Sequence, residues 1–277
     1  MRRELITLRR TSLGLLAAAL AVVGIWGCGA SVLPEVHSEQ ERLATARRLA
    51  GSGDYGTAAE MLKTYVDRNA GASDEDGAIY LLGECYLNMR EWASAQLEFE
   101  RLLRDYPESD SAGSASFRLG EALFGQSKME DFDQEYTQKA LIQWQDYLAA
   151  YPDHWRHAQG EKKVLEARMK LASKLLDNAD LYVKLKLVEP ARTYYQKILD
   201  EYGDLPLAGQ AEIGLARCDL LYGRRDAAID RLKRVESEHA GEPAAVVAKR
   251  EREKAEHSRA HAPIRPPAKP IPAPPGS

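Results

Sequence analysis

Catalytic motifs are missing from this 277-residue sequence. It has no nucleophile elbow, no phosphate-binding loop and no zinc-protease helix. Its nearest approach to a metal-binding cluster is the pair His154 and His157, which lies just past the helix-stopping Pro152 and has no predictable third ligand. These absences argue against an enzyme, and we expect neither a metal ion nor a cofactor.

Patterns typical of β-strands are also scarce, whereas apolar residues recur at helical spacing over about 200 residues. The aromatic residues are mostly tyrosine, with 13 tyrosines against four phenylalanines and four tryptophans. Tyrosine suits helix packing because its ring can be buried while its hydroxyl reaches the surface. The composition therefore predicts an all-α protein.

Residues 79–107 form one complete helix–turn–helix unit. The positions that share a face are Ile79, Leu82, Gly83 and Tyr86 in the first predicted helix and Ala95, Phe99 and Leu102 in the second. Pro107 cannot continue the second helix. This order resembles the tetratricopeptide signature, in which a small residue in each helix lets two antiparallel helices approach closely.

A single unit of this kind cannot bury its own apolar face, so the pattern should recur. The second-helix alanines that mark the repeats are Ala58, Ala95, Ala140, Ala191 and Ala228. The steps between them are 37, 45, 51 and 37 residues, and the two longer steps predict insertions. We expect a tetratricopeptide-like superhelix of about five antiparallel helix pairs over residues 38–240. Generic helical hairpins outside that class are the alternative.

The N-terminus has the layout of a bacterial secretory signal. Four arginines precede an apolar run from Leu13 to Ile25, which is too short for a comfortable membrane span. Cys28 then closes Ile25-Trp26-Gly27-Cys28, which resembles a lipoprotein processing box. We expect residues 1–27 to be a signal peptide, Cys28 to be lipidated and residues 28–37 to be an anchored linker. Ordinary signal cleavage, which would leave Cys28 free, is the alternative.

The residue after Cys28 indicates the membrane to which the protein is sorted, and the net charge of the mature chain indicates which partners to expect. The residue after Cys28 is Gly29 rather than aspartate, which by resemblance to enteric lipoproteins favours the outer membrane. Removal of residues 1–27 takes away four arginines and one glutamate, which leaves 34 basic and 41 acidic residues and a formal charge of −7. Nucleic acid is therefore not an expected partner.

The other two cysteines, Cys85 and Cys218, each lie two residues after a predicted helix-contact position, where the repeat usually carries alanine. They are interpreted as small packing residues. A disulfide between them would have to join the second and fifth repeats, which a stacked array should hold far apart.

The character of the sequence changes over residues 241–277. The stretch 244–260 is charged and helix-compatible, and residues 261–277 are Pro-rich and too poor in large apolar side chains to pack. We predict a charged, then Pro-rich, disordered tail. Its net positive charge leaves two possibilities open, a solvated tail without a partner or an arm that touches acidic partners or cell-wall polymer.

A concave groove is the candidate binding surface of such a stack. The positions that usually face it are Leu43, Arg47 and Ala50 in the first repeat, Tyr80, Glu84, Leu87 and Asn88 in the second, and Phe117, Glu121 and Phe124 in the third. These residues lie off the packing face, so Tyr80, Leu87, Phe117 and Phe124 should be exposed and could bind an extended peptide. The alternative is that the flanking insertion or the N-terminal segment covers them.

Residues 28–240 together resemble the BamD/YfiO-type family, the outer-membrane lipoproteins of the β-barrel assembly machinery. The lipoprotein cysteine, five degenerate repeats and the third-repeat insertion carry the resemblance. Within it, Asp131-Phe-Asp-Gln134 leads to Lys139-Ala140, and Ala179-Asp180-Leu181-Tyr182-Val183-Lys184 is close to the family's fourth-repeat helix. The first repeat departs from the pattern by ending in Asn69-Ala-Gly-Ala-Ser, without a Tyr-Pro stop.

The resemblance implies a lipid-anchored, periplasm-facing scaffold at the cell outer membrane. It implies that the C-terminal repeats hold the β-barrel insertase subunit, alongside other assembly-machinery lipoproteins, and that the N-terminal repeats receive unfolded outer-membrane protein segments. Two other classes stay open. One is a tetratricopeptide lipoprotein scaffold of another envelope machine, such as pilus or secretin assembly or Tol-Pal-linked division. The other is an envelope enzyme accessory that uses the pair His154 and His157.

Overall fold

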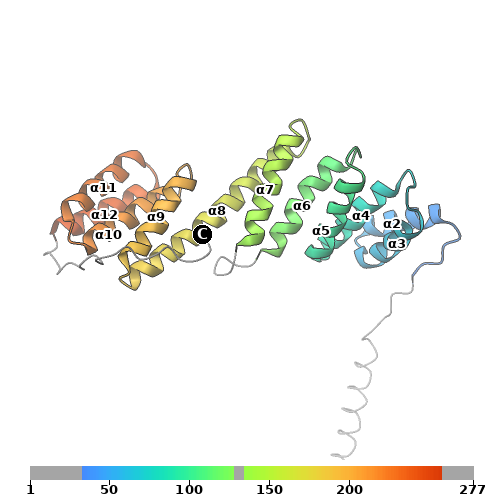
Figure 1. Cartoon of the computed structure of the whole chain (residues 1–277), viewed down its shortest axis with the longest axis horizontal. Helices are drawn as coiled ribbons and strands as arrows, with labels where there is room; N and C mark the ends of the chain where they lie inside the picture. The colour runs from blue at the N-terminus through green and yellow to red at the C-terminus, as the bar shows by residue number, and fades with distance from the viewer. Residues whose placement is uncertain (1–32, 128–133, 258–277) are drawn as a thin grey trace, which may run out of the picture. The chain divides into compact units, whose positions relative to one another are not determined.

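The computed structural model describes residues 33–127 and 134–257. The predicted signal peptide, the lipidation site Cys28 and the Pro-rich end of the predicted tail lie outside the described residues. Every regular element within them is an α-helix (Figure 1). The helices are α2 (Glu39–Ser52), α3 (Tyr55–Arg68), α4 (Glu75–Asn88), α5 (Trp92–Asp105), α6 (Ala112–Gln126), α7 (Glu135–Ala150), α8 (His157–Lys184), α9 (Val188–Tyr202), α10 (Ala208–Leu221), α11 (Arg225–Glu238) and α12 (Pro243–His257). The all-α prediction is confirmed, and the order of α2 to α11 matches the five predicted pairs.

The chain divides into two compact units, and the division falls between Cys85 and Tyr86, inside α4. The first unit contains α2, α3 and most of α4. Its α2 begins where Ser38 accepts a hydrogen bond from the Glu41 backbone N–H, and it ends at Gly53, whose φ of 89° is left-handed. The hydroxyl of the buried Tyr65 donates a hydrogen bond of 2.5 Å to Asp74, which ties the end of α3 to the approach to α4.

The second unit contains the helices from α5 to α12. Each of them packs against the next in the chain, and α10 also contacts α8 and α12. Contacts between alternate helices are typical of stacked hairpins, in which the first helix of one pair touches the first helix of the next. The unit is therefore an array of helix pairs that grows by stacking.

Glycine residues set the closest helix approaches in this unit. A β-carbon on Gly120 of α6 would lie 2.3 Å from Trp144 Nε1 of α7. Trp144 is fully buried and its indole N–H donates a hydrogen bond of 3.1 Å to the Phe117 carbonyl. Gly120 has the place in the third repeat that Gly83 has in the second, which is the small residue of the first helix. Gly214 of α10 likewise allows close approach of the Tyr195 ring, because a β-carbon on Gly214 would lie 2.2 Å from Tyr195 Cζ. The sequence pattern did not identify Gly214 as a helix-contact residue.

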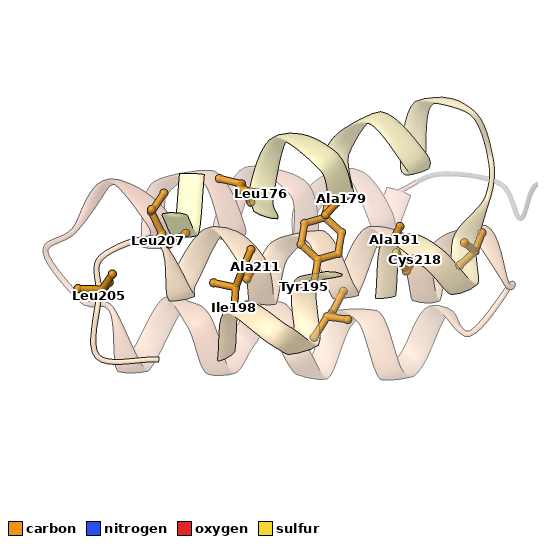
Figure 2. Close-up of a cluster of buried hydrophobic side chains, with 12 residues drawn as sticks. Leu176, Ala179, Ala191, Tyr195, Ile198, Leu205, Leu207, Ala211 and Cys218 are labelled. Carbon is orange, nitrogen blue, oxygen red and sulfur yellow. The ribbon is translucent and has the colours of Figure 1, made fainter. Parts of the chain in front are cut away.

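One core cluster joins α8, α9 and α10 (Figure 2). Small residues, Ala179, Ala191 and Cys218, surround the ring of Tyr195, which is fully buried. The Tyr195 hydroxyl donates a hydrogen bond to the Asp180 carboxylate. The composition predicted tyrosine hydroxyls at the surface, whereas Tyr195 is buried as a whole and its hydroxyl is paired within the protein.

The two long repeat steps are accommodated differently. The 51-residue step is absorbed by α8, which runs for 28 residues as one helix. The 45-residue step falls between α6 and α7, where residues 128–133 lie outside the described part.

The prediction of a disordered tail from residue 241 is wrong for residues 243–257, which form α12. Ala244 and Ala248 are buried against Ile213 of α10 and Leu232 of α11. The charged residues of α12 pair with its neighbours rather than with solvent alone, as in the ion pair of 2.6 Å between Arg252 and Glu236. A helix with a narrow alanine stripe and charged flanks can therefore cover the apolar end of a repeat stack.

Candidate peptide-binding site

The predicted groove residues of the first unit differ in exposure. Leu43 is buried, with 3% of its surface exposed, which does not fit its predicted place on the groove surface. It packs inward with Ala46 on the same face of α2. Arg47 is exposed, and Tyr80 and Glu84 of α4 are half-buried.

In the second unit, four predicted groove residues line one pocket of about 300 Å³, namely Leu87, Asn88, Glu121 and Phe124. The other lining residues are Trp92, Arg118, Gly125, Trp144 and Lys163. They come from the end of α4 and from α5, α6, α7 and α8. The structure thus brings together a subset of the predicted groove and adds residues from three helices that the repeat register did not include.

Phe117 does not reach this pocket, and its predicted exposure is wrong. Its side chain is 1% exposed. The ring lies edge-on against Tyr147 of α7, with 5.5 Å between ring centroids, and Arg156 lies over it at 5.2 Å from the centroid. Because Tyr147 of α7 and Arg156 before α8 cover this position, Phe117 is a packing residue. Leu87 is also largely buried, at 9% exposed.

Aromatic rings form the apolar part of the pocket. The rings of Phe124 and Trp144 have centroids 5.5 Å apart and are tilted by 50°. Trp92 packs over Gly125, where a β-carbon would lie 2.5 Å from Trp92 Cδ2. Neither Trp92 nor Trp144 is among the groove residues predicted from the sequence. The available signal was Gly125, because a glycine next to an aromatic residue leaves room for a second ring.

Charged side chains surround these rings. Arg118 and Glu121 form an ion pair of 2.6 Å. Lys163 Nζ lies 5.8 Å from the centroid of Phe124, and Lys170 Nζ lies 5.0 Å from it. Cations at such distances are attracted to the ring faces. The pocket can therefore accept an apolar or aromatic side chain and offer hydrogen-bonding and ionic groups to the chain that carries it.

The histidine pair is occupied by protein contacts. His154 Nδ1 lies 2.7 Å from the Tyr147 hydroxyl, and its Nε2 lies 3.3 Å from the Ser114 hydroxyl. Burial, reinforced by the nearby Arg156 charge, lowers the pKa of His154 below its usual value. His157 begins α8 and lies 3.8 Å from Glu161. Within residues 33–127 and 134–257, no three histidine, cysteine or carboxylate side chains are grouped so as to hold a metal ion.

Cys85 and Cys218 are free and buried. Burial raises the pKa of each thiol to about 12. Their interpretation as packing residues agrees with this environment, and the alternative of a disulfide between them is wrong.

The stacked hairpins with a pocket of aromatic and charged side chains define a helical-repeat scaffold of the tetratricopeptide type, which points to protein binding. The family model described as YfiO, outer membrane lipoprotein, matches residues 45–217, and the chain belongs to this family. Of the helices in the described parts, none has both the length and the apolarity needed to cross a bilayer.

Solved structures with a related arrangement include a thermophilic tetratricopeptide protein from Thermus thermophilus, which is 18% identical. That comparison covers 79% of this chain and 99% of the other, with a TM-score of 0.36. A tetratricopeptide repeat protein from Parabacteroides merdae is 16% identical, over 78% of this chain and 72% of the other, with a TM-score of 0.35. None of the curated proteins matches the chain significantly.

Proposed function

We propose that this protein is a lipid-anchored scaffold on the periplasmic side of the outer membrane that assists the assembly and insertion of β-barrel outer-membrane proteins. Membership of the YfiO family of outer-membrane lipoproteins supports the location. In this proposal Cys28 carries the lipid, and the chain works by binding other proteins. Its partners are the β-barrel insertase subunit, the other lipoproteins of the assembly machinery and unfolded outer-membrane protein segments.

The observation that carries the peptide-binding part is the pocket formed by Trp92, Phe124 and Trp144 with its charged rim. Unfolded segments of β-barrel proteins alternate apolar and polar side chains, because one face of each strand will meet lipid and the other the barrel interior. An apolar side chain of such a segment fits among the rings, while its polar neighbours meet groups such as Arg118 and Lys163. This pairing of an apolar anchor with a polar rim is typical of protein recognition sites.

The peptide contacts proposed on this basis keep the predicted residues but change the roles of two of them, Phe117 and Leu43. In the second unit Leu87, Asn88, Glu121 and Phe124 contact the peptide, whereas Phe117 is a packing residue. In the first unit Arg47, Tyr80 and Glu84 are the candidates with accessible surface, and Leu43 supports α2.

A pull-down of the tagged full-length protein, solubilised from its own membranes, tests the function. We expect a large β-barrel protein with periplasmic repeat domains to co-purify, identified by mass spectrometry. A variant with Cys28→Ala serves as the control for membrane attachment and should remain as precursor at the inner membrane. Recovery of pilus, secretin or Tol-Pal components instead would show that the protein is a scaffold of that machine.

A further inference from the structure

The turn between α8 and α9 exposes three leucines within seven residues. Leu181 is 52% exposed, Leu185 is 57% exposed and Leu187 is 42% exposed. The residues between them include Lys184 and Lys186, which are also exposed. Single exposed leucines are ordinary on protein surfaces, but a turn that alternates leucine and lysine places apolar and cationic groups together.

The backbone of this turn is fixed. The Leu187 N–H donates to the Tyr182 carbonyl at 2.9 Å, and the Lys186 N–H donates to the Val183 carbonyl at 2.9 Å. These two bonds form the Schellman arrangement that ends many helices. Beneath it, the rings of Tyr182 and Tyr194 stack with centroids 5.6 Å apart. The three leucines therefore project from an ordered tip, which comprises residues 181–187, and do not fold back onto the core.

Lys186 stands in a backbone position that favours glycine. Its φ is 60°, which is left-handed. A positive φ is adopted by glycine in the α2–α3 turn, at Gly53, and in the α10–α11 turn, at Gly223, and by Arg90 in the α4–α5 turn. A side chain at such a position costs conformational energy that glycine avoids. Strain of this kind is often kept where the side chain has a function.

The tip is also cationic on a chain whose formal net charge is −4. Among the described residues, neither lysine of the tip has a carboxylate within ion-pair distance. Glu189, the acidic residue that begins α9, accepts a hydrogen bond of 2.6 Å from the Tyr222 hydroxyl. Asp180 of α8 accepts a hydrogen bond from the Tyr195 hydroxyl and lies 4.0 Å from Arg217. Asp177 is exposed one helical turn before Leu181.

We propose that the α8–α9 turn binds the surface of a bilayer that contains anionic phospholipid, as a membrane contact separate from the lipid anchor. Leu185 enters the boundary between headgroups and acyl chains, and the ammonium groups of Lys184 and Lys186 meet lipid phosphates. Membership of an outer-membrane lipoprotein family places a bilayer within reach of the chain. Shallow insertion of a few apolar side chains flanked by cations is a recognised mode of membrane binding. A tip of three leucines is small beside the roughly 800 Å² that each partner buries in a stable protein interface.

The test is sedimentation of the mature chain with vesicles, with Cys28→Ser so that acyl chains do not contribute. We expect the protein to bind vesicles of phosphatidylethanolamine and phosphatidylglycerol at low salt and to bind phosphatidylcholine vesicles weakly. Lys184→Gln and Lys186→Gln should each weaken binding about fivefold. Leu185→Ser should weaken it without changing the salt dependence.

Matched controls separate this tip from general surface effects. Lys233→Gln and Lys249→Gln remove exposed lysines from α11 and α12 and should leave binding unchanged. Ile142→Ser removes an apolar side chain with the same 57% exposure as Leu185 and should also have no effect.

Lys186→Gly distinguishes membrane binding from a structural role, because it should raise the melting temperature while it weakens vesicle binding. The proposal is overturned if the unsubstituted chain does not bind anionic vesicles, if the controls weaken binding equally, or if Lys186→Gly stabilises the fold without weakening binding. Capture of an acidic protein segment by the turn, with no vesicle binding, would likewise assign this surface to a protein partner.

Discussion

Gly120 sets the distance between α6 and α7. A β-carbon there would lie 2.3 Å from the Trp144 indole nitrogen, which donates to the Phe117 carbonyl. Trp144 is fully buried, so it cannot move aside without disturbing its neighbours. We expect Gly120→Ala to lower the free energy of unfolding by on the order of 1–3 kcal/mol. Urea denaturation of the soluble mature chain measures this difference.

Gly51→Ala is the matched control, because a β-carbon on Gly51 in α2 meets no atom within 4 Å. This change should be neutral or slightly stabilising, since alanine favours a helix over glycine. Equal effects at the two glycines would show that the α6–α7 crossing is looser than described.

The two buried thiols provide a second prediction at the residue scale. Burial raises the pKa of Cys85 and Cys218 to about 12. At pH 8 only about one thiol in ten thousand would be ionised, and the thiolate is the reactive form. We expect neither cysteine to react with an aromatic disulfide reagent in the native chain with Cys28→Ser, and both to react in urea. Rapid reaction of either thiol without denaturant would contradict its burial.

Prediction of single residues succeeded where the repeat spacing fixes a position. It failed where the position depends on which side chain from another helix packs against it. The repeat register identified Gly120, because the small residue of the first helix has a fixed place in the pattern. Gly125 and Gly214 lie at other positions, and each is required by a ring from a different helix. Sequence spacing alone does not say which ring will approach.

At the scale of elements, α12 shows how a charged helix can belong to the folded body. Ala248 is fully buried within the cluster that contains Ile213 and Leu232. We expect Ala248→Asp to lower the free energy of unfolding by on the order of 3 kcal/mol, because it buries a carboxylate among apolar side chains. Thermal and urea denaturation would measure the loss.

Val246→Asp introduces the same charge on the same helix at a side chain that is 62% exposed. It should change the free energy of unfolding by no more than about 0.5 kcal/mol. If Ala248→Asp were as mild as this control, α12 would not be packed on α10 and α11.

The sequence pattern missed α12 and the length of α8 for different physical reasons. Ala244, Ala248 and Ala255 are small, so they give a weak apolar signal, yet small residues permit the close approach that buries α12. For α8 the sequence predicts an insertion and not a longer helix, because the pattern fixes where each pair recurs and not how long its first helix runs. The existence of the helices within the repeats was therefore predictable, whereas the presence of α12 and the length of α8 depended on packing against neighbouring helices.

At the scale of the whole molecule, we expect peptide binding and stability to depend on different phenylalanines. Phe124 is half-exposed among the pocket rings, so Phe124→Ser should weaken capture of an unfolded outer-membrane protein segment by roughly tenfold or more. The helicity of the Phe124→Ser variant, measured by circular dichroism, should be unchanged. Phe117→Ser should instead cost about 3–5 kcal/mol of stability, because that ring is buried against Tyr147.

Leu97→Ser, which changes a 65% exposed residue of α5 outside the pocket, is the control and should affect neither property. Peptide capture that survives Phe124→Ser would move the site away from this pocket. A stable Phe117→Ser variant that loses capture would restore Phe117 to the binding surface.

The sequence by itself determined the helical class and the spacing of the repeats, because both follow from apolar residues that recur at helical intervals. It also predicted a groove near Phe124, since that position faces away from the packing face of its own pair. Only the tertiary structure decided which groove residues are accessible. Burial depends on the side chains that neighbouring helices bring, such as Tyr147 over Phe117 and Trp92 over Gly125, and no single helix encodes those contacts.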